Sequence, residues 1–123
     1  MARAFTCLGA GPDLHAAYRG AVGEGGPVAS TTGVRELDVP PGAHPSKLGT
    51  WVQRAAQDPA AAADVPEEHR GVVEREAVAL VADPATCLAI RLDGDLAERT
   101  KARAGAAPGD VAYLLFGLAP EHS

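Results

Sequence analysis

Apolar residues recur with helical spacing in three stretches of the chain, residues 14–22, 48–56 and 72–81. Within each stretch they fall at positions such as i, i+3, i+4 and i+7, which lie on one side of an α-helix. The sequence therefore predicts three helices, each with one apolar stripe. The stripes consist of Leu14, Ala17, Tyr18, Ala21 and Val22, of Leu48, Trp51, Val52, Ala55 and Ala56, and of Val72, Val73, Ala77, Leu80 and Val81.

Capping signals precede all three stretches. Pro12 suits the first turn of the first helix, Ser46 can cap the second, and Asp64 with Pro66 marks the start of the third. Residues 40–45 contain three prolines, which remove amide donors and fix φ. This segment is predicted to be a stiff surface loop.

Four other stretches have the pattern of β-strands. Residues 4–8 form a short apolar run that ends at the turn-like residues 9–12, and residues 28–39 are rich in valine and threonine. Residues 86–92 alternate regularly between two sets of side chains. Residues 111–118 are an apolar run that fits either a strand or a short buried helix, although the turn before it favours a strand.

These elements predict one small α+β domain that spans residues 1–123. A further short helix is expected at residues 96–104, and residues 58–63, with four alanines, are expected to form a linker or a frayed turn. A chain of this length can bury a single core. The order of strands and helices suggests a sheet of about four strands with the helices packed on one face.

Charge is distributed unevenly along this acidic chain, whose net charge is −5. Residues 1–61 contain five basic and five acidic residues, whereas residues 62–123 contain six basic and eleven acidic residues. Nucleic-acid binding without sequence preference depends on clustered Lys and Arg, and the sequence contains no such cluster. The charge pattern therefore argues against a nucleic-acid partner.

The compartment is predicted from the first residues and from the cysteines. No apolar segment reaches the length of a signal peptide or of a membrane span. Cys7 and Cys87 are far apart, each in an apolar run without metal-ligand spacing, so we expect two free buried thiols. The sequence predicts a cytoplasmic protein that does not enter the membrane.

No recognisable catalytic or metal-binding motif occurs in the chain. There is no GxSxG turn, and the four histidines have no helical i, i+4 pairing. The Gly9 to Gly11 segment lies between a predicted strand and helix, where a phosphate can bind, but Leu14 replaces the third glycine of a dinucleotide motif. We expect a plain turn there, no metal site and no cofactor, and the sequence leaves open whether the protein is an enzyme.

Four residues are candidates for binding a ligand. His44 lies in the proline-rich loop, which would hold its imidazole in solvent with little entropy to lose. Small proteins of this kind build a pocket between sheet and helices, where Tyr18, Trp51 and Tyr113 are suitable lining residues. Core packing is the competing interpretation for Tyr18 and Trp51, because both lie on apolar helical stripes.

The last third of the chain permits another interpretation. Residues 87–104 resemble the strand and first helix of ribbon-helix-helix repressors, with residues 110–118 in the place of the second helix. In that family a ribbon made of one strand from each of two chains enters the major groove, and its outward side chains read the bases. The resemblance implies that Ala89 and Arg91 contact DNA.

Since a catalytic signature is missing, the leading hypothesis is a small noncatalytic binding or accessory protein that acts through a protein partner or a small ligand. The acidic second half suits a basic protein partner. The alternatives are a small enzyme with a pocket between sheet and helices, and a ribbon-helix-helix-like DNA-binding regulator that uses residues 87–118. We also expect a homodimer, because the exposed edge of so small a sheet is commonly covered by pairing.

Overall fold

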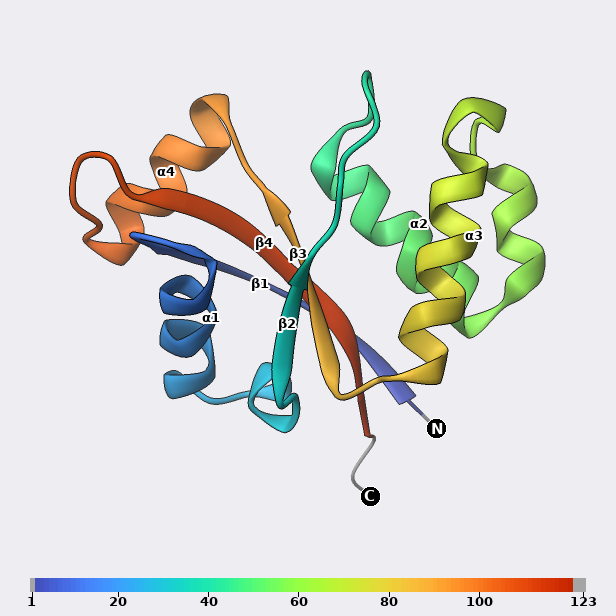
Figure 1. Ribbon diagram of the computed structural model, residues 1–123, viewed down its shortest axis with the longest axis horizontal. Helices are drawn as coiled ribbons and strands as arrows, with labels where there is room; N and C mark the ends of the chain where they lie inside the picture. Colours follow the sequence, from blue (N-terminus) through green and yellow to red (C-terminus); the bar gives the residue numbers. More distant parts are fainter. Residues whose placement is uncertain (1, 121–123) are drawn as a thin grey trace.

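The computed structural model describes residues 2–120, and the side chains of residues 4–119. Within this range the chain forms one mixed sheet with helices around it (Figure 1). In chain order the elements are β1 (Ala2–Gly11), α1 (Leu14–Gly23), the 3₁₀ helix η1 (Pro27–Ser30), β2 (Gly33–Glu36), α2 (Pro45–Gln57), the 3₁₀ helix η2 (Pro59–Asp64), α3 (Glu67–Ala82), β3 (Thr86–Arg91), α4 (Gly94–Ala104) and β4 (Val111–Pro120).

The four strands lie in the order β1-β4-β3-β2. β4 is antiparallel to both of its neighbours, whereas β2 is parallel to β3. Between β2 and β3 the chain passes through α2, η2 and α3, which supply the long crossover that a parallel pair requires. The predicted α+β class, with a sheet of about four strands, is confirmed.

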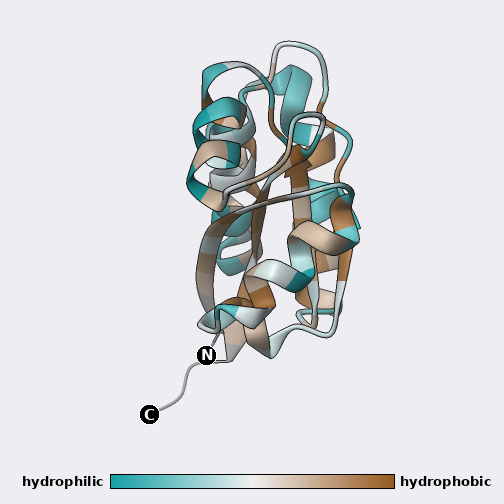
Figure 2. Cartoon of the chain, turned by 90° about the vertical axis from the view of Figure 1, so that its left-hand side faces the viewer, coloured by the Kyte–Doolittle hydropathy of each residue, from teal (hydrophilic) through white to brown (hydrophobic). Residues whose placement is uncertain are grey.

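Helices cover both faces of the sheet, whereas the sequence predicted that they pack on one face. Successive side chains of a strand point to opposite faces. In β3, Cys87 and Ala89 pack in the cluster that contains α1, while Leu88 and Ile90 pack in the cluster that contains α2 and α3. Figure 1 shows α1 on one side of the sheet and α2 and α3 on the other, and Figure 2 shows the hydrophobic residues concentrated in the strands between them.

β1 continues through the segment that was predicted to be a turn. Gly9 lies inside this strand, and a Cβ atom at its position would be 2.9 Å from the Ala17 carbonyl oxygen. Glycine therefore lets α1 cross the strand at close range. The helix begins after Asp13 rather than at Pro12, because the Asp13 carboxylate accepts a hydrogen bond from the Ala16 N–H at 2.8 Å.

The segment 28–39, predicted to be a strand or a hairpin arm, is a strand only at β2. The 3₁₀ helix η1 occupies its first part, and the Thr31 hydroxyl donates a hydrogen bond to the Val28 carbonyl oxygen at 2.6 Å. After β2 the chain keeps one more sheet contact, from the Leu37 N–H to the Ala89 carbonyl oxygen at 2.7 Å. The valine and threonine content therefore marks a buried segment that is only partly extended.

The third predicted helix is present as α3, with two differences from the prediction. Pro66 occupies the N-cap position instead of Asp64, because the residues before it form η2 rather than a linker. Val73 and Leu80 are buried as predicted, but Val81 has 57% of its surface exposed. The apolar residues of α3 thus do not all face the core.

Residues 111–120 form strand β4, which decides the open prediction for this segment in favour of a strand. The ribbon-helix-helix arrangement needs a helix here, so the chain does not adopt it. Moreover, β3 lies between β4 and β2, which leaves this strand no free edge for a ribbon with a second chain. Ala89, one of the two residues implied to contact DNA, is fully buried under the α1 side of the sheet.

Candidate functional site

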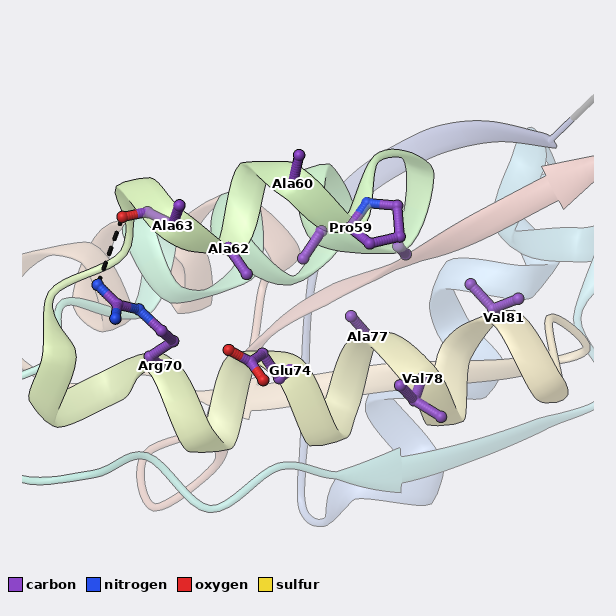
Figure 3. Close-up of a pocket in the computed structure, with 11 residues that line it drawn as sticks. Pro59, Ala60, Ala62, Ala63, Arg70, Glu74, Ala77, Val78 and Val81 are labelled. Atoms are coloured by element: carbon purple, nitrogen blue, oxygen red, sulfur yellow. Dashed lines mark hydrogen bonds between the residues drawn. The ribbon is translucent and has the colours of Figure 1, made fainter.

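A groove of about 620 Å³ lies between α2, η2 and α3 (Figure 3). In Figure 3, Pro59, Ala60, Ala62 and Ala63 of η2 are on one side, and Ala77, Val78 and Val81 of α3 are on the other. The residues that line it are Ala55, Ala56, Pro59, Ala60, Ala62, Ala63, Arg70, Glu74, Ala77, Val78 and Val81.

Alanine side chains form most of the groove, and the local sequence explains their helical arrangement. The Asp58 carboxylate accepts a hydrogen bond from the Ala60 N–H at 3.1 Å, and Pro59 occupies the first turn, so η2 begins with a side-chain cap and a preset φ. Because an alanine side chain ends at Cβ, the surface of η2 has no high ridges. A partner backbone can therefore approach it closely.

The opposite wall contains the second apolar stripe of α3. Val78 and Val81 have 70% and 57% of their surfaces exposed, although both are large apolar side chains. Together with Glu74 they occupy positions i, i+4 and i+7, a stripe beside the buried one that contains Val73 and Leu80. α3 therefore has two apolar stripes. One is buried against the core, and the other faces the groove.

The charged residues of the groove are Arg70 and Glu74. Arg70 Nη2 donates hydrogen bonds to the Val65 carbonyl oxygen at 3.0 Å and to the Ala63 carbonyl oxygen at 3.4 Å, the second of which is drawn in Figure 3. The guanidinium thus holds the end of η2 against α3. Its Nε atom is buried without a hydrogen-bond partner in the described structure, whereas Glu74 is exposed.

A half-buried ion pair between Arg35 and Glu76 connects α3 to the sheet. The carboxylate of Glu76, which is 5% exposed, accepts hydrogen bonds from Arg35 of β2 at 2.7 and 3.3 Å. This two-point contact is the geometry in which Arg and carboxylate interact most strongly. The partner of Glu76 lies on a strand 41 residues away in the chain, so the local sequence of α3 does not indicate this contact.

A buried amide fixes α2 to the sheet in a similar way. Gln53 Nε2 donates hydrogen bonds to the carbonyl oxygens of Phe5 at 2.5 Å and Gly117 at 3.3 Å, which are opposite each other in β1 and β4. The two helices that carry the groove are thus both held by polar contacts to the sheet. These contacts fix the positions of α2 and α3, and with them two walls of the groove.

The structure separates the four predicted ligand residues. Tyr18 and Tyr113 are buried on the α1 side of the sheet, where the Tyr18 hydroxyl lies 2.6 Å from Thr31 Oγ1. Burial and, second, the carboxylate of Glu36 raise the pKa of Tyr113 above its ordinary value, while Arg91 lowers it. Both tyrosines therefore contribute to packing on this side.

His44 and Trp51 belong to α2, on the other side of the sheet. His44 is the N-cap residue, and its Nδ1 accepts a hydrogen bond from the Ser46 N–H at 3.2 Å. Trp51 is half-buried and stacks on the ring of His69, with 6.1 Å between ring centroids. The structure brings neither residue to the groove.

A second, smaller hollow of about 260 Å³ lies where the parallel strands β2 and β3 end. Arg91 lines it together with the carboxylates of Glu36, Asp38 and Asp93. In the described residues, no group of three or more His, Cys, Asp or Glu side chains is arranged to hold a metal ion.

The two cysteines are free, and neither is an activated nucleophile. Burial is the largest effect on both: it raises the pKa of the Cys7 thiol, and it raises the pKa of Cys87 to about 12. Since the thiolate is the reactive form, burial makes both thiols less reactive.

Comparisons with known proteins add no relative: the chain matches no protein-family model, no curated protein and no solved structure. Between residues 2 and 120, no helix combines the length and the apolar character that crossing a membrane requires. The interpretation of the site therefore depends on its own geometry.

The groove was not predicted from the sequence, because each of its segments had a simpler structural interpretation. The alanines of residues 60–63 were interpreted as a linker, and Val78 was not part of the predicted stripe. A signal was present in the spacing of Glu74, Val78 and Val81, but such a stripe becomes informative only when the neighbouring wall is known.

Proposed function

We propose that this chain is a noncatalytic binding protein, and that the groove between α2, η2 and α3 holds an apolar α-helical segment of a protein partner. The observation that carries the proposal is the pair of exposed side chains, Val78 and Val81, beside a groove lined mainly by alanine. Single exposed apolar residues are ordinary, whereas a contiguous apolar surface with a hollow is typical of an interaction site.

The distribution of polar groups supports a helix as the occupant. A site for a small polar molecule needs several polar groups that converge on it. Here Arg70 and Glu74 are the charged lining residues, so most of the groove offers apolar contact alone. An amphipathic helix meets such a surface with a stripe at i, i+3, i+4 and i+7, and small side chains allow the helices to approach within about 8–10 Å.

The acidic excess of the chain supports a basic partner. Glu67, Glu68 and Glu74 are exposed on α3, and the second half of the chain has the excess of acidic residues. Charge complementarity mainly affects the rate and the specificity of association. We therefore infer a partner helix with Lys or Arg on the side next to its apolar stripe.

We also propose that the protein forms a homodimer and works in the cytoplasm. Its two free thiols, Cys7 and Cys87, suit a reducing compartment, where structural disulfides are rare. The dimer is proposed because the sheet has a long free edge strand.

Site-specific photo-crosslinking in the producing cells tests the proposed groove. A photoreactive amino acid replaces Ala60 in one variant and Val78 in a second, so that the probes stand on opposite walls. Ala79, which is exposed on α3 and does not line the groove, carries the probe in the control. The proposal expects one partner segment, with apolar residues at helical spacing, to be linked from positions 60 and 78 and not from position 79.

Binding of a synthetic peptide with that segment's sequence provides the quantitative test. Val78→Asp is expected to weaken binding about tenfold or more, since it replaces an apolar contact worth roughly 1.5 kcal/mol or more by a charge. Ala79→Asp, the matched control, should leave the affinity unchanged. Equal affinities for the two variants, or no segment shared by positions 60 and 78, would refute the groove as the binding site.

A further inference from the structure

The outer edge of β1 is a long, unprotected strand edge. β1 lies at one end of the sheet, and no backbone hydrogen bond connects its outer side to another element in residues 2–120. It has ten residues, whereas the strand at the opposite edge, β2, has four. Charged residues and prolines usually protect such edges, but residues 4–11 contain neither.

Hydrogen-bond alternation shows which residues of β1 face outward. The Leu92 N–H donates to the Ala112 carbonyl oxygen at 2.9 Å, so even-numbered residues of β4 bond to the β3 side. The odd-numbered residues of β4 therefore bond to β1, and Leu115 is paired with Cys7. It follows that the backbone groups of the even-numbered residues Ala4, Thr6, Leu8 and Ala10 point away from the sheet.

We propose that β1 pairs antiparallel with β1 of a second copy of this chain, about a two-fold axis at Cys7. In this register Cys7 lies opposite Cys7 of the second copy, and Thr6 lies opposite its Leu8. The outward backbone groups of both strands then form about eight hydrogen bonds, because even-numbered residues are opposite even-numbered residues. The two sheets become one continuous sheet.

Leu8 favours this register over the neighbouring one with the axis at Thr6. Two-fold symmetry with matching faces permits an axis at any residue of β1, and the axes at Thr6 and at Cys7 pair the largest number of residues. Leu8 is 37% exposed and lines a cleft of about 310 Å³ beside α4. With the axis at Cys7, the Leu8 side chains of the two copies become diagonal neighbours and cover each other, whereas the axis at Thr6 places Leu8 opposite Ala4 of the second copy.

A second copy is a suitable occupant because the edge is complementary to itself. The paired residues are small or apolar, so close approach of the backbones is unhindered. Residues 4–11 carry no charge, so the two paired strands do not place like charges opposite each other. The inference gives the homodimer proposed above a specific interface, and it does not depend on the groove.

The mass in solution, measured by sedimentation across a range of concentrations, is the first test. The wild-type protein should have twice the 12.5 kDa mass of the chain. Thr6→Pro should be monomeric, because it removes an outward N–H that the single chain does not use and places a ring at the edge. Thr6→Val, the control, keeps the strand and should remain a dimer.

If Thr6→Pro does not fold, as judged by circular dichroism, Thr6→Lys replaces it with the same expected loss of the dimer. A monomeric wild-type protein would overturn both the homodimer and this interface. A dimer that survives the edge substitution would overturn the interface while leaving self-association in place. Neither result concerns the groove, which its own variants test.

Disulfide trapping tests the register. Oxidation by dioxygen with a copper catalyst should link two chains through Cys7, since non-hydrogen-bonded antiparallel pairs have Cα atoms about 4.5 Å apart, within disulfide range. Burial raises the pKa of Cys7, so the reaction is run at alkaline pH. Cys7→Ser should abolish the link, because Cys87 is fully buried. A link obtained only with Thr6→Cys in the Cys7→Ser background would overturn the axis at Cys7.

Discussion

The helices on the two sides of the sheet differ in how much of their apolar surface is buried. On one side, α1 and η1 bury Ala17 and Val28 to 1% and 3% exposure, and the polar tip of Tyr18 is satisfied by Thr31. On the other side, α2 and α3 bury their inner stripes equally well, with Leu80 at 1% exposure, yet Val78 remains exposed. α1 has one apolar stripe, which packs against the sheet. α3 has a second apolar stripe that no part of the described chain covers.

The largest expected effect comes from the inner stripe of α3. Leu80→Ala should lower the free energy of unfolding by about 2–5 kcal/mol, because it removes apolar burial and leaves a cavity in a packed core. Urea denaturation followed by circular dichroism measures the change. A loss well below 1 kcal/mol would mean that the inner stripe is less tightly packed than its burial indicates.

The ion pair between α3 and β2 should have the next largest effect. Glu76→Gln weakens the two-point contact with Arg35 and should cost about 1–3 kcal/mol in the free energy of unfolding. Arg35 is partly exposed and can turn to solvent, which keeps the cost below that of a fully buried pair. Glu74→Gln, on the exposed side of the same helix, is the control. Equal losses of unfolding free energy in the two variants would show that the ion pair of Glu76 does not stabilise the fold.

Alkaline pH should destabilise the α1 side through Cys87. Burial raises the pKa of this thiol from 9.0 to about 12, so above pH 9 the unfolded chain loses the proton more readily than the folded one. The contribution of Cys87 to the free energy of unfolding is fully present below pH 9. It falls by on the order of 1.4 kcal/mol per pH unit between pH 9 and pH 12.

Denaturant unfolding at pH 8 and pH 10 measures that dependence. Cys87→Ala should remove this part of the slope, whatever its effect at pH 8, while tyrosines and lysines contribute equally in both proteins. An identical slope in the variant would show that Cys87 does not keep its proton in the folded state.

The smallest effect is expected at the outer stripe. Val81→Ser should change the free energy of unfolding by no more than about 0.5 kcal/mol, because the side chain is 57% exposed and contributes little to the core. Leu80 is the preceding residue, yet its substitution is expected to lower the free energy of unfolding by several kcal/mol more, about 2–5 kcal/mol in total. A loss at Val81 comparable with that at Leu80 would show that the groove wall is part of the core.

Several elements could be predicted from the local sequence because the spacing of their apolar residues is enough to identify them. The stripes of α1 and α2 each pack against one surface, and the strand at residues 86–92 was indicated by the regular alternation of its side chains. Errors occurred where a contact from elsewhere decided the outcome. Gly9 was interpreted as a turn residue although α1 crosses it, and no local pattern indicated that Glu76 pairs with Arg35.

The candidate site was less predictable than the fold. His44, Trp51, Tyr18 and Tyr113 were selected for their chemistry, and the structure places them in separate surroundings. The groove instead consists of residues with little chemistry of their own. Its character comes from the spacing between η2 and α3, a distance that no local pattern specifies.

The sequence by itself determined the class of fold, the number of strands and the positions of most helices, because periodicity and capping act over a few residues. Only the tertiary structure decided that helices cover both faces, that β3 lies inside the sheet, and that α3 has an uncovered stripe. Each of these depends on which segments meet across long stretches of chain. The alternation in β3 shows the difference: it correctly indicated a strand, but both sets of side chains are buried because α1 and α2 come from distant parts of the sequence.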